Sequence, residues 1–203
     1  MVKVKICGIT NLEDALIAVD AGADAIGFVF AEQSPRSVSP QKAAAIIAKL
    51  PPLVQTVGLF VDDDLERINW LADFCGLDII QLHGDEDPDF CTEIRRRIIK
   101  VFRVKDAASL ANLASYQVAG YLLDAWSAEA HGGTGKTFDW DLAREAAASR
   151  PIIIAGGLTP VNVLDAVDIV RPYGVDVSSG VELSPGKKDP EKVRNFIRAL
   201  KGR

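Results

Sequence analysis

A regular alternation of short apolar runs with helical patterns is the feature that most constrains how this chain can fold. Most of the apolar runs are rich in β-branched residues and too short for helices, which is typical of buried strands. Eight such runs occur, at residues 2–7, 25–30, 56–61, 79–82, 99–104, 120–123, 152–155 and 175–178. Alternation this regular predicts parallel strands joined by right-handed crossovers.

Capping residues indicate where the intervening helices begin. Thr10, followed by Glu13, has the spacing of a capping box. Further helices are predicted wherever a capping residue precedes a proline in the first helical position. These pairs are Ser39-Pro40, Asp87-Pro88, Thr159-Pro160 and Asp189-Pro190.

Three other helical segments have weaker start signals. The aspartates at 62–64 are interpreted as caps of a helix over residues 65–74. Another helix begins near Asp139. The segment around 107–114 is short, so we expect the fifth helix to be irregular.

Eight strand-and-helix units in 203 residues leave about 25 residues for each unit, which is lean but sufficient for a closed barrel. We therefore predict an α/β fold, a (β/α)8 TIM barrel of parallel strands. No Ser/Gly/Pro-rich linker divides the chain, so residues 1–203 are expected to form a single domain. An open doubly wound sheet usually has a glycine-rich turn after its first strand, whereas this strand is followed by Gly8-Ile9-Thr10.

The charge balance argues against a nucleic-acid partner. The formal net charge is -5, whereas neutralising backbone phosphates needs a clustered Lys/Arg surface. The basic run at 95–97 lies late in a helical pattern, where cations complement the helix dipole. The first residues alternate polar with apolar, and no stretch reaches the roughly 18 apolar residues of a membrane helix. We expect no membrane association and a cytoplasmic location.

The cysteines are also informative. Cys7, Cys75 and Cys91 are widely spaced, form no CxxC pair, and have only His83 and His131 as possible imidazole partners. We therefore expect neither a disulfide scaffold nor a metal site. We do expect a reducing compartment. Cys75 and Cys91 lie in helical patterns, where a cysteine is usually a small buried apolar residue.

Polar residues at the strand ends are candidate functional residues, because barrels of this kind place their active sites at the C-terminal ends of the strands. Cys7 ends the first strand, where a thiolate is able to remove a proton from carbon if the site lowers its pKa. Asp124 ends the sixth strand, and no helix begins until about Asp139, which favours a catalytic role over a cap. The other polar strand ends are Asp62, Gln81, His83, Arg103 and Asp176.

Two candidates leave more than one interpretation open. Arg36 lies in a long loop over residues 31–39, where it is either solvated or forms a bidentate contact with a carboxylate. His83 either lines the site or only hydrogen-bonds the next loop.

Glycines gather at the last two strand ends, where such barrels commonly hold a phosphate with backbone amides. They occur as Gly156-Gly157 and as Ser179-Gly180. One such pair alone indicates no more than a tight turn. Because glycines follow both the seventh and the eighth strand, we predict a phosphate site.

Residues 130–137 (AHGGTGKT) nearly match the P-loop pattern of nucleotide-binding proteins, with alanine for the first glycine. A working P-loop joins a strand directly to a helix, whereas this segment begins several residues after Asp124. We interpret it as part of a flexible Gly-rich lid within the long loop 125–138.

The chain also resembles a known family over nearly its whole length, through motifs that are weak singly and specific as a set. They are KICGIT at 5–10, SPR at 34–36 within 28–39, QLHG at 81–84, LD at 123–124, GGTG at 132–135, FDW at 138–140, AGGL at 155–158 and DVSSGVE at 176–182. In these motifs it is similar to phosphoribosylanthranilate isomerases.

The resemblance implies an Amadori rearrangement in tryptophan biosynthesis, in which a phosphoribosyl anthranilate is converted to a carboxyphenylamino deoxyribulose phosphate without a cofactor. Asp124 would be the general acid and Cys7 the general base. Arg36 would contact the anthranilate carboxylate and Asp176 a sugar hydroxyl. The amides of Gly156, Gly157, Ser179 and Gly180 would hold the phosphate, and His83 would line the substrate site.

Two alternatives remain at this point. An isomerase of the histidine-pathway type performs the same chemistry on a larger aminoimidazole substrate, and a dual-substrate enzyme accepts either compound. That family is associated with a pair of aspartates rather than with Cys7 and Asp124. A non-catalytic phosphosugar-binding barrel needs the glycine loops but neither acid nor base. The chain is expected to be a monomer or a homodimer, a choice that the sequence leaves open.

Overall fold

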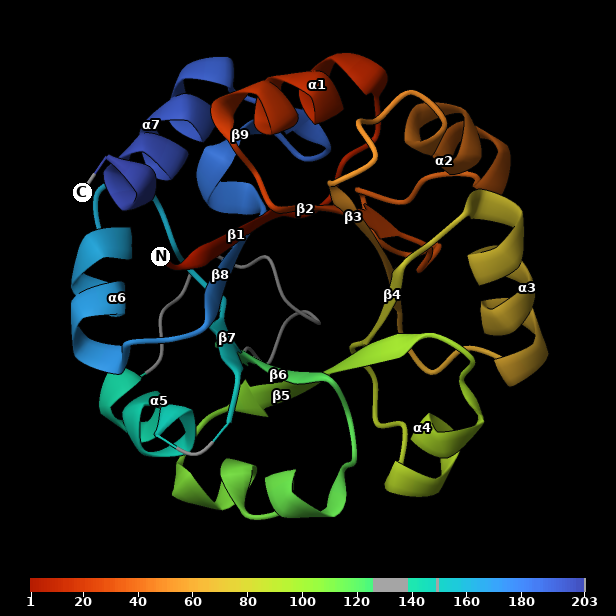
Figure 1. Cartoon of the computed structure of the whole chain (residues 1–203). Coiled ribbons are helices and arrows are strands. Elements are labelled where there is room, and N and C mark those ends of the chain that lie inside the picture. The colour runs from red at the N-terminus through yellow and green to blue at the C-terminus, as the bar shows by residue number, and fades with distance from the viewer. Residues whose placement is uncertain (126–138, 149, 203) are drawn as a thin grey trace.

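A computed structural model describes residues 1–125, 139–148 and 150–202 of the chain. Eight parallel strands, β1 to β8, close into a barrel, with β8 pairing back onto β1 (Figure 1). They are β1 (Lys3–Ile6), β2 (Ala25–Val29), β3 (Gln55–Phe60), β4 (Ile79–Leu82), β5 (Arg97–Val104), β6 (Gly120–Ala125), β7 (Ile152–Ile154) and β8 (Gly174–Val177). The predicted (β/α)8 architecture is confirmed, and each predicted strand overlaps an observed one.

Helices form a ring around the barrel (Figure 1). They are α1 (Leu12–Ala21), α2 (Pro40–Ile47), α3 (Leu65–Cys75), α4 (Pro88–Glu93), α5 (Trp140–Ala147), α6 (Val163–Val170) and α7 (Pro190–Lys201). Two short 3-10 turns, η1 (Ala107–Leu110) and η2 (Leu113–Ser115), connect β5 to β6, which confirms the irregular segment predicted there. After β8 come the turn η3 (Ser179–Val181) and a hairpin of β9 (Glu182–Ser184) and β10 (Lys187–Lys188).

Most predicted helix starts are correct, and two are wrong. Side-chain oxygens of Ser39, Asp87, Asp139 and Asp189 each accept a backbone N–H in the first turn of the following helix. Asn11 rather than Thr10 caps α1, because the Thr10 hydroxyl donates instead to the carbonyl of Gly186. The sixth helix begins at Val163 rather than Pro160, after a turn in which Asn162 accepts the N–H of Thr159.

Two further sequence interpretations need correction. Residues 95–97 do not lie in a helix, since α4 ends at Glu93 and Arg97 begins β5. Of the three aspartates at 62–64, only Asp64 accepts a backbone N–H of α3. Asp62 has a left-handed φ of 46°, and its carboxylate accepts the N–H of Asp85 instead.

The period-2 alternation of each strand separates two layers of core. Outward residues pack between the barrel and the helices in one large cluster, which includes Val4, Ile6, Ile80, Leu82 and Leu123. A smaller cluster fills the interior, with Val57, Ile79, Ile99, Val101, Leu122 and Ala155. A third, small cluster of Cys7, Val29 and Leu59 lies at the end of the barrel where polar side chains such as Asp124 and Asp176 also face inward.

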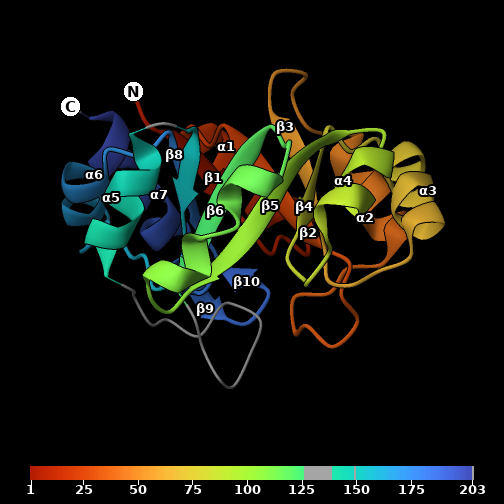
Figure 2. The same cartoon turned by 90° about the horizontal axis from the view of Figure 1, so that it is seen from below.

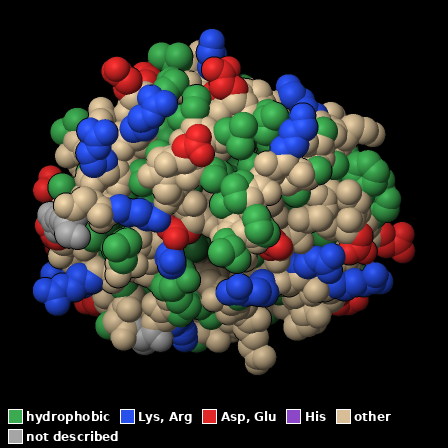
Figure 3. Space-filling view, turned by 45° about the horizontal axis from the view of Figure 1, so that its top comes forward, with side chains coloured by type: hydrophobic (Ala, Val, Ile, Leu, Met, Phe, Trp, Pro, Cys, Tyr) green, Lys and Arg blue, Asp and Glu red, His purple; other side chains and the backbone are tan. Residues whose placement is uncertain are grey.

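The two mouths of the barrel lie on opposite faces (Figure 2). The N-terminus lies at one mouth, and the β9–β10 hairpin lies at the other, beyond the C-terminal ends of the strands. On the face drawn in Figure 3, Lys and Arg side chains are spread among acidic and apolar ones. In the part of the chain that the structure describes, no helix is both long and apolar enough to span a membrane.

Candidate active site

A cavity of about 350 Å³ opens at the C-terminal mouth of the barrel. Part of its lining is apolar, formed by Val29, Leu59, Leu122 and Ala155. All nine site residues predicted from the sequence line it: Cys7, Arg36, His83, Asp124, Gly156, Gly157, Asp176, Ser179 and Gly180. The structure therefore brings together residues from five strand ends and the long loop after β2, while their chemical roles stay predictions.

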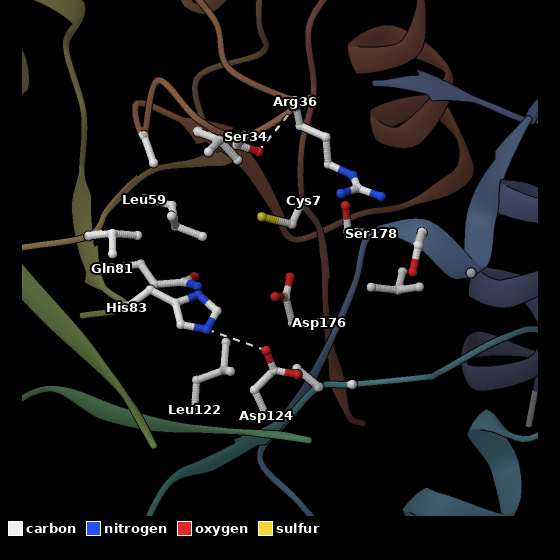
Figure 4. A pocket seen from close by; sticks show the side chains of 18 of the residues that line it. Cys7, Ser34, Arg36, Leu59, Gln81, His83, Leu122, Asp124, Asp176 and Ser178 are labelled. Atoms are coloured by element: carbon white, nitrogen blue, oxygen red, sulfur yellow. Dashed lines mark hydrogen bonds and ion pairs between the residues drawn. The ribbon is translucent and has the colours of Figure 1, made fainter. Parts of the chain in front are cut away.

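Strand alternation explains why these side chains converge. On β6, Leu122 and Asp124 are two residues apart and both face the interior, whereas Leu123 between them packs against the helices. Gln81 and His83 repeat this spacing at the end of β4. In Figure 4 the side chains of Cys7, Asp176 and Asp124 point into the same space.

Asp124 and His83 form a buried pair. Oδ2 of Asp124 lies 3.3 Å from Nε2 of His83, and each side chain is less than a tenth exposed (Figure 4). Their orientation does not meet the geometry of a hydrogen bond, so both ring nitrogens of His83 lack such a partner among the described residues. Buried polar atoms normally have partners. The His83 ring therefore lines the cavity with both ring nitrogens free of hydrogen bonds among the described residues.

Gly156 makes the position of Asp124 possible. Gly156 has a φ of 80°, and an added Cβ would lie 2.8 Å from Oδ1 of Asp124 and 2.5 Å from the amide nitrogen of Ala125. Any side chain at this position would displace the end of β6. The predicted phosphate glycine thus also has a structural task.

Cys7 is buried beside two charged groups. Burial raises the pKa of its thiol, the positive charge of Lys5 lowers it, and the negative charge of Asp176 raises it again. The net result lies above the ordinary value for a thiol. The lowered pKa on which a catalytic role for this thiol was made conditional is therefore not found.

Arg36 is held in place by a carboxylate that the sequence argument overlooked. Nε of Arg36 donates to both carboxylate oxygens of Glu182 at 3.0 and 3.2 Å, and Nη2 donates to one of them at 2.8 Å. Lys188 also donates to Glu182, at 2.8 Å. Burial raises the pKa of Glu182, but Arg36 and Lys188 outweigh it and hold this pKa below its usual value. Two cations around one carboxylate leave a net positive charge beside the cavity.

The glycine-rich ends of β7 and β8 pack against each other. A Cβ on Gly180 would lie 1.8 Å from the carbonyl oxygen of Leu158, so the two loops approach more closely than any side chain permits. Gly157 has a φ of 63°. This close approach agrees with the tight-turn interpretation, and because these glycines also line the cavity, the phosphate interpretation stays a prediction.

Some sequence candidates lie elsewhere, and some site residues were missed. Asp62 and Arg103 do not line the cavity, and Arg103 pairs with Asp85. Lys5 was missed although it lies two residues before Cys7, a spacing that places both on the inner face. Glu182 was missed because its partner Arg36 is 146 residues away. The P-loop-like segment and the predicted lid at 130–137 lie outside the described residues.

Comparisons with known proteins agree on one family. A family model described as N-(5'phosphoribosyl)anthranilate (PRA) isomerase matches residues 4–199. The N-(5'-phosphoribosyl)anthranilate isomerase of Pelobacter propionicus is 64% identical over 201 residues, covering 99% of this chain and 96% of the relative.

Solved structures agree with the sequence matches. A phosphoribosyl anthranilate isomerase in complex with reduced 1-(o-carboxyphenylamino)-1-deoxyribulose 5-phosphate is 44% identical, with a TM-score of 0.91 over all of both chains. Monomers generated from the dimeric enzyme of Thermotoga maritima are 43% identical, with the same TM-score and coverage. By sequence and by fold, this chain belongs to the N-(5'-phosphoribosyl)anthranilate isomerase family.

Proposed function

We propose that this protein converts N-(5-phosphoribosyl)anthranilate to 1-(2-carboxyphenylamino)-1-deoxyribulose 5-phosphate in tryptophan biosynthesis. The observation that carries the proposal is the convergence of a thiol, Cys7, and a carboxyl group, Asp124, on one buried cavity (Figure 4). An Amadori rearrangement needs an acid and a base acting at different atoms of one substrate. An arginine at the rim and glycine-rich walls suit the two anionic ends of that substrate.

The reaction begins with ring opening. Asp124 in its protonated form delivers a proton to the furanose ring oxygen, the bond between that oxygen and C1 breaks, and the anthranilate nitrogen supplies the electron pair that forms an iminium group. Nε2 of His83 lies 3.3 Å from Oδ2 of this carboxyl group. Because the substrate's own amine provides these electrons, the mechanism calls for no cofactor or metal ion.

The second step is proton abstraction. The Cys7 thiolate takes the proton from C2, and the C–H electrons move toward the iminium nitrogen to give an enolamine. The enolamine gains a proton at C1 and loses its hydroxyl proton to become the ketone. The overall reaction is an aldose–ketose isomerisation, which is an intramolecular oxidoreduction.

The same geometry supports a set of proposed binding contacts. Arg36, held by Glu182, keeps donors for the anthranilate carboxylate, and Asp176 accepts a sugar hydroxyl. The amides of Gly156, Gly157, Ser179 and Gly180 hold the phosphate. We further propose that the protein acts in the cytoplasm as a single-domain monomer or homodimer; the dimeric Thermotoga maritima relative makes the second form a concrete option.

Turnover of two substrates and binding of the product test the proposal. Phosphoribosyl anthranilate should be consumed, which is followed as loss of its anthranilate-type fluorescence, while the larger aminoimidazole substrate of histidine biosynthesis should not react. Reaction of the aminoimidazole alone would assign the barrel to the other pathway. Binding of the product without turnover of either substrate would indicate a phosphosugar-binding protein.

A further inference from the structure

Lys5 is a buried ammonium group that the proposed mechanism does not use. It lies on β1 two residues before Cys7, and its side chain is 5% exposed. It does not line the substrate cavity, but lies below it inside the barrel. A buried charge is tolerated only with a partner. That partner is Asp176, its direct neighbour in the β1–β8 register, whose Oδ1 accepts from Nζ at 2.8 Å.

Gly27 on β2 lets Lys5 and Cys7 lie side by side. A Cβ on Gly27 would be 2.8 Å from Sγ of Cys7 and 3.1 Å from Cε of Lys5. Both side chains therefore occupy the space that the missing side chain leaves over β2. The end of the Lys5 side chain lies next to the thiol that the mechanism uses as a base.

The ionisable groups around Cys7 come from several elements. They are Lys5 from β1, Asp176 from β8, Lys188 from β10, Arg36 from the loop after β2, Glu182 from β9, and His83 and Asp124 at the ends of β4 and β6. Arg36 and Lys188 share the Glu182 carboxylate, and His83 is paired with Asp124. Of the charged groups that act directly on the thiol, Lys5 has the largest effect in favour of the thiolate.

Lys5 keeps its charge over the working pH range. Burial lowers the pKa of Lys5, but the charges of Asp176 and Cys7 outweigh burial and raise it to about 12. The ammonium is therefore a permanent positive charge next to Sγ. Without it, burial and the negative charge of Asp176 would both oppose ionisation of the thiol.

We propose that Lys5 is a positioning residue whose buried ammonium, anchored by Asp176, stabilises the thiolate of Cys7. This inference rests on the proposed role of Cys7 as the base. During the reaction Lys5 exchanges no proton: the thiolate takes the C2 proton and becomes neutral, while the ammonium stays bound to Asp176. The competing interpretation is that Lys5 only neutralises Asp176 and so holds β1 to β8.

The test titrates Cys7 directly. In a background with Cys75→Ala and Cys91→Ala, the rate of alkylation by iodoacetamide is measured against pH, because only the thiolate reacts. Lys5→Met and Lys5→Gln are compared with the parent. Glutamine is still able to donate a hydrogen bond to Asp176 but carries no charge. We expect both variants to titrate at least about one pH unit higher and to lose about tenfold or more in kcat/KM at neutral pH.

Two further variants are matched controls. Lys5→Arg keeps the charge and should titrate like the parent, which also keeps the test valid if the neutral variants fold poorly. Lys100→Met removes another buried lysine, which pairs with Glu86, and should leave the Cys7 titration unchanged. Thermal melts of every variant report loss of fold separately.

An unchanged alkylation profile in Lys5→Gln would overturn the inference, as would a Lys5→Arg profile shifted as far as that of Lys5→Met. The proposed function fails by a different route. If Cys7→Ala kept parental turnover, Cys7 would not be the base, yet the alkylation profiles would still decide whether Lys5 stabilises its thiolate.

Discussion

The two mouths of the barrel differ in what their cavities leave unpaired. The cavity at the N-terminal mouth is the larger, about 510 Å³ against about 350 Å³. The carboxylate at its rim is matched, since Asp24 accepts from both Lys3 and Lys201 at 3.0 Å. At the C-terminal mouth, Oε1 of Gln81 and both ring nitrogens of His83 are buried without hydrogen bonds among the described residues.

The larger volume therefore does not mark the binding cavity. The buried polar atoms without hydrogen bonds do. A buried polar atom without a partner destabilises the folded protein by about 1–3 kcal/mol, so several of them in one cavity indicate a place where a ligand completes the hydrogen bonding. The comparison predicts that substitutions at the C-terminal mouth change activity, whereas substitutions at the N-terminal mouth change stability.

Cys7→Ala should have the largest effect, because a methyl group cannot accept the C2 proton. We expect kcat to fall by about 10² to 10⁴-fold, with the fold and the affinity for a product analogue nearly intact. Steady-state kinetics and a melting curve measure these quantities. Cys75→Ala and Cys91→Ala are matched controls that should be kinetically silent, although both thiols are buried and their loss lowers stability. Activity within a few-fold of the parent would exclude Cys7 as the base.

Asp124→Asn should lower kcat by at least about a hundredfold with little change in KM. Asparagine is nearly isosteric and still able to hydrogen-bond, but it cannot deliver an acidic proton to the ring oxygen. Single-turnover kinetics isolate the chemical step. A near-parental rate constant would remove Asp124 from the mechanism and leave the acid unidentified.

Gly180→Ala tests the phosphate site. The added methyl group meets the carbonyl of Leu158, so the loops after β7 and β8 must separate and their amides lose alignment. We expect KM to rise about tenfold or more, and the dephosphorylated substrate to bind weakly to parent and variant alike. Gly76→Ala, at the C-terminal cap of α3 with a φ of 73°, should lower stability and leave KM alone. If Gly180→Ala left KM unchanged, the phosphate would have to bind elsewhere.

Glu182→Gln should have a smaller effect and act mainly on substrate binding. It replaces a charge-assisted fork with weaker hydrogen bonds and so loosens Arg36, which does not take part in the chemical steps. We expect KM to rise about three- to tenfold and kcat to change less. The exposed Glu191→Gln in the first turn of α7 is the control. A large loss in kcat at constant KM would mean that Glu182 acts on the reaction rather than through Arg36.

Asp24→Asn, at the N-terminal mouth, should be kinetically silent and lower the free energy of unfolding by about 1 kcal/mol. Burial raises the pKa of Asp24, but hydrogen bonds from the N–H of Val4 and from Lys3 and Lys201 outweigh it and hold the pKa below its usual value. A lowered pKa in the folded state means that this stabilisation is complete above about pH 4 and is lost as the pH falls through the folded-state pKa.

Urea unfolding at pH 7 and pH 3 checks this. The difference between the parent and Asp24→Asn should shrink at the lower pH. A loss of activity in Asp24→Asn would contradict the prediction that substitutions at the N-terminal mouth change stability and not activity.

Local sequence patterns were enough to predict the barrel and most residues at its C-terminal mouth. Strands and helix caps are local patterns, and the period-2 alternation of a strand decides which residues face inward, so Cys7, Asp124 and Asp176 were predictable as neighbours. The same logic, applied two residues earlier on β1, would have found Lys5. Thr10 and Thr159 show the limit of local signals, because Asn11 and Asn162 were equally good competitors a few residues away.

The pairing of charged side chains, by contrast, depends on how distant parts of the chain fold together. Lys5 and Asp176 are 171 residues apart, and Arg36 and Glu182 are 146 apart, so no local pattern links them. Their contact depends on closure of β8 onto β1 and on the hairpin that follows β8. The direction of the pKa shift of Cys7 was likewise not predictable from the sequence. It depends on burial and on two opposite charges that folding brings to one side of the barrel.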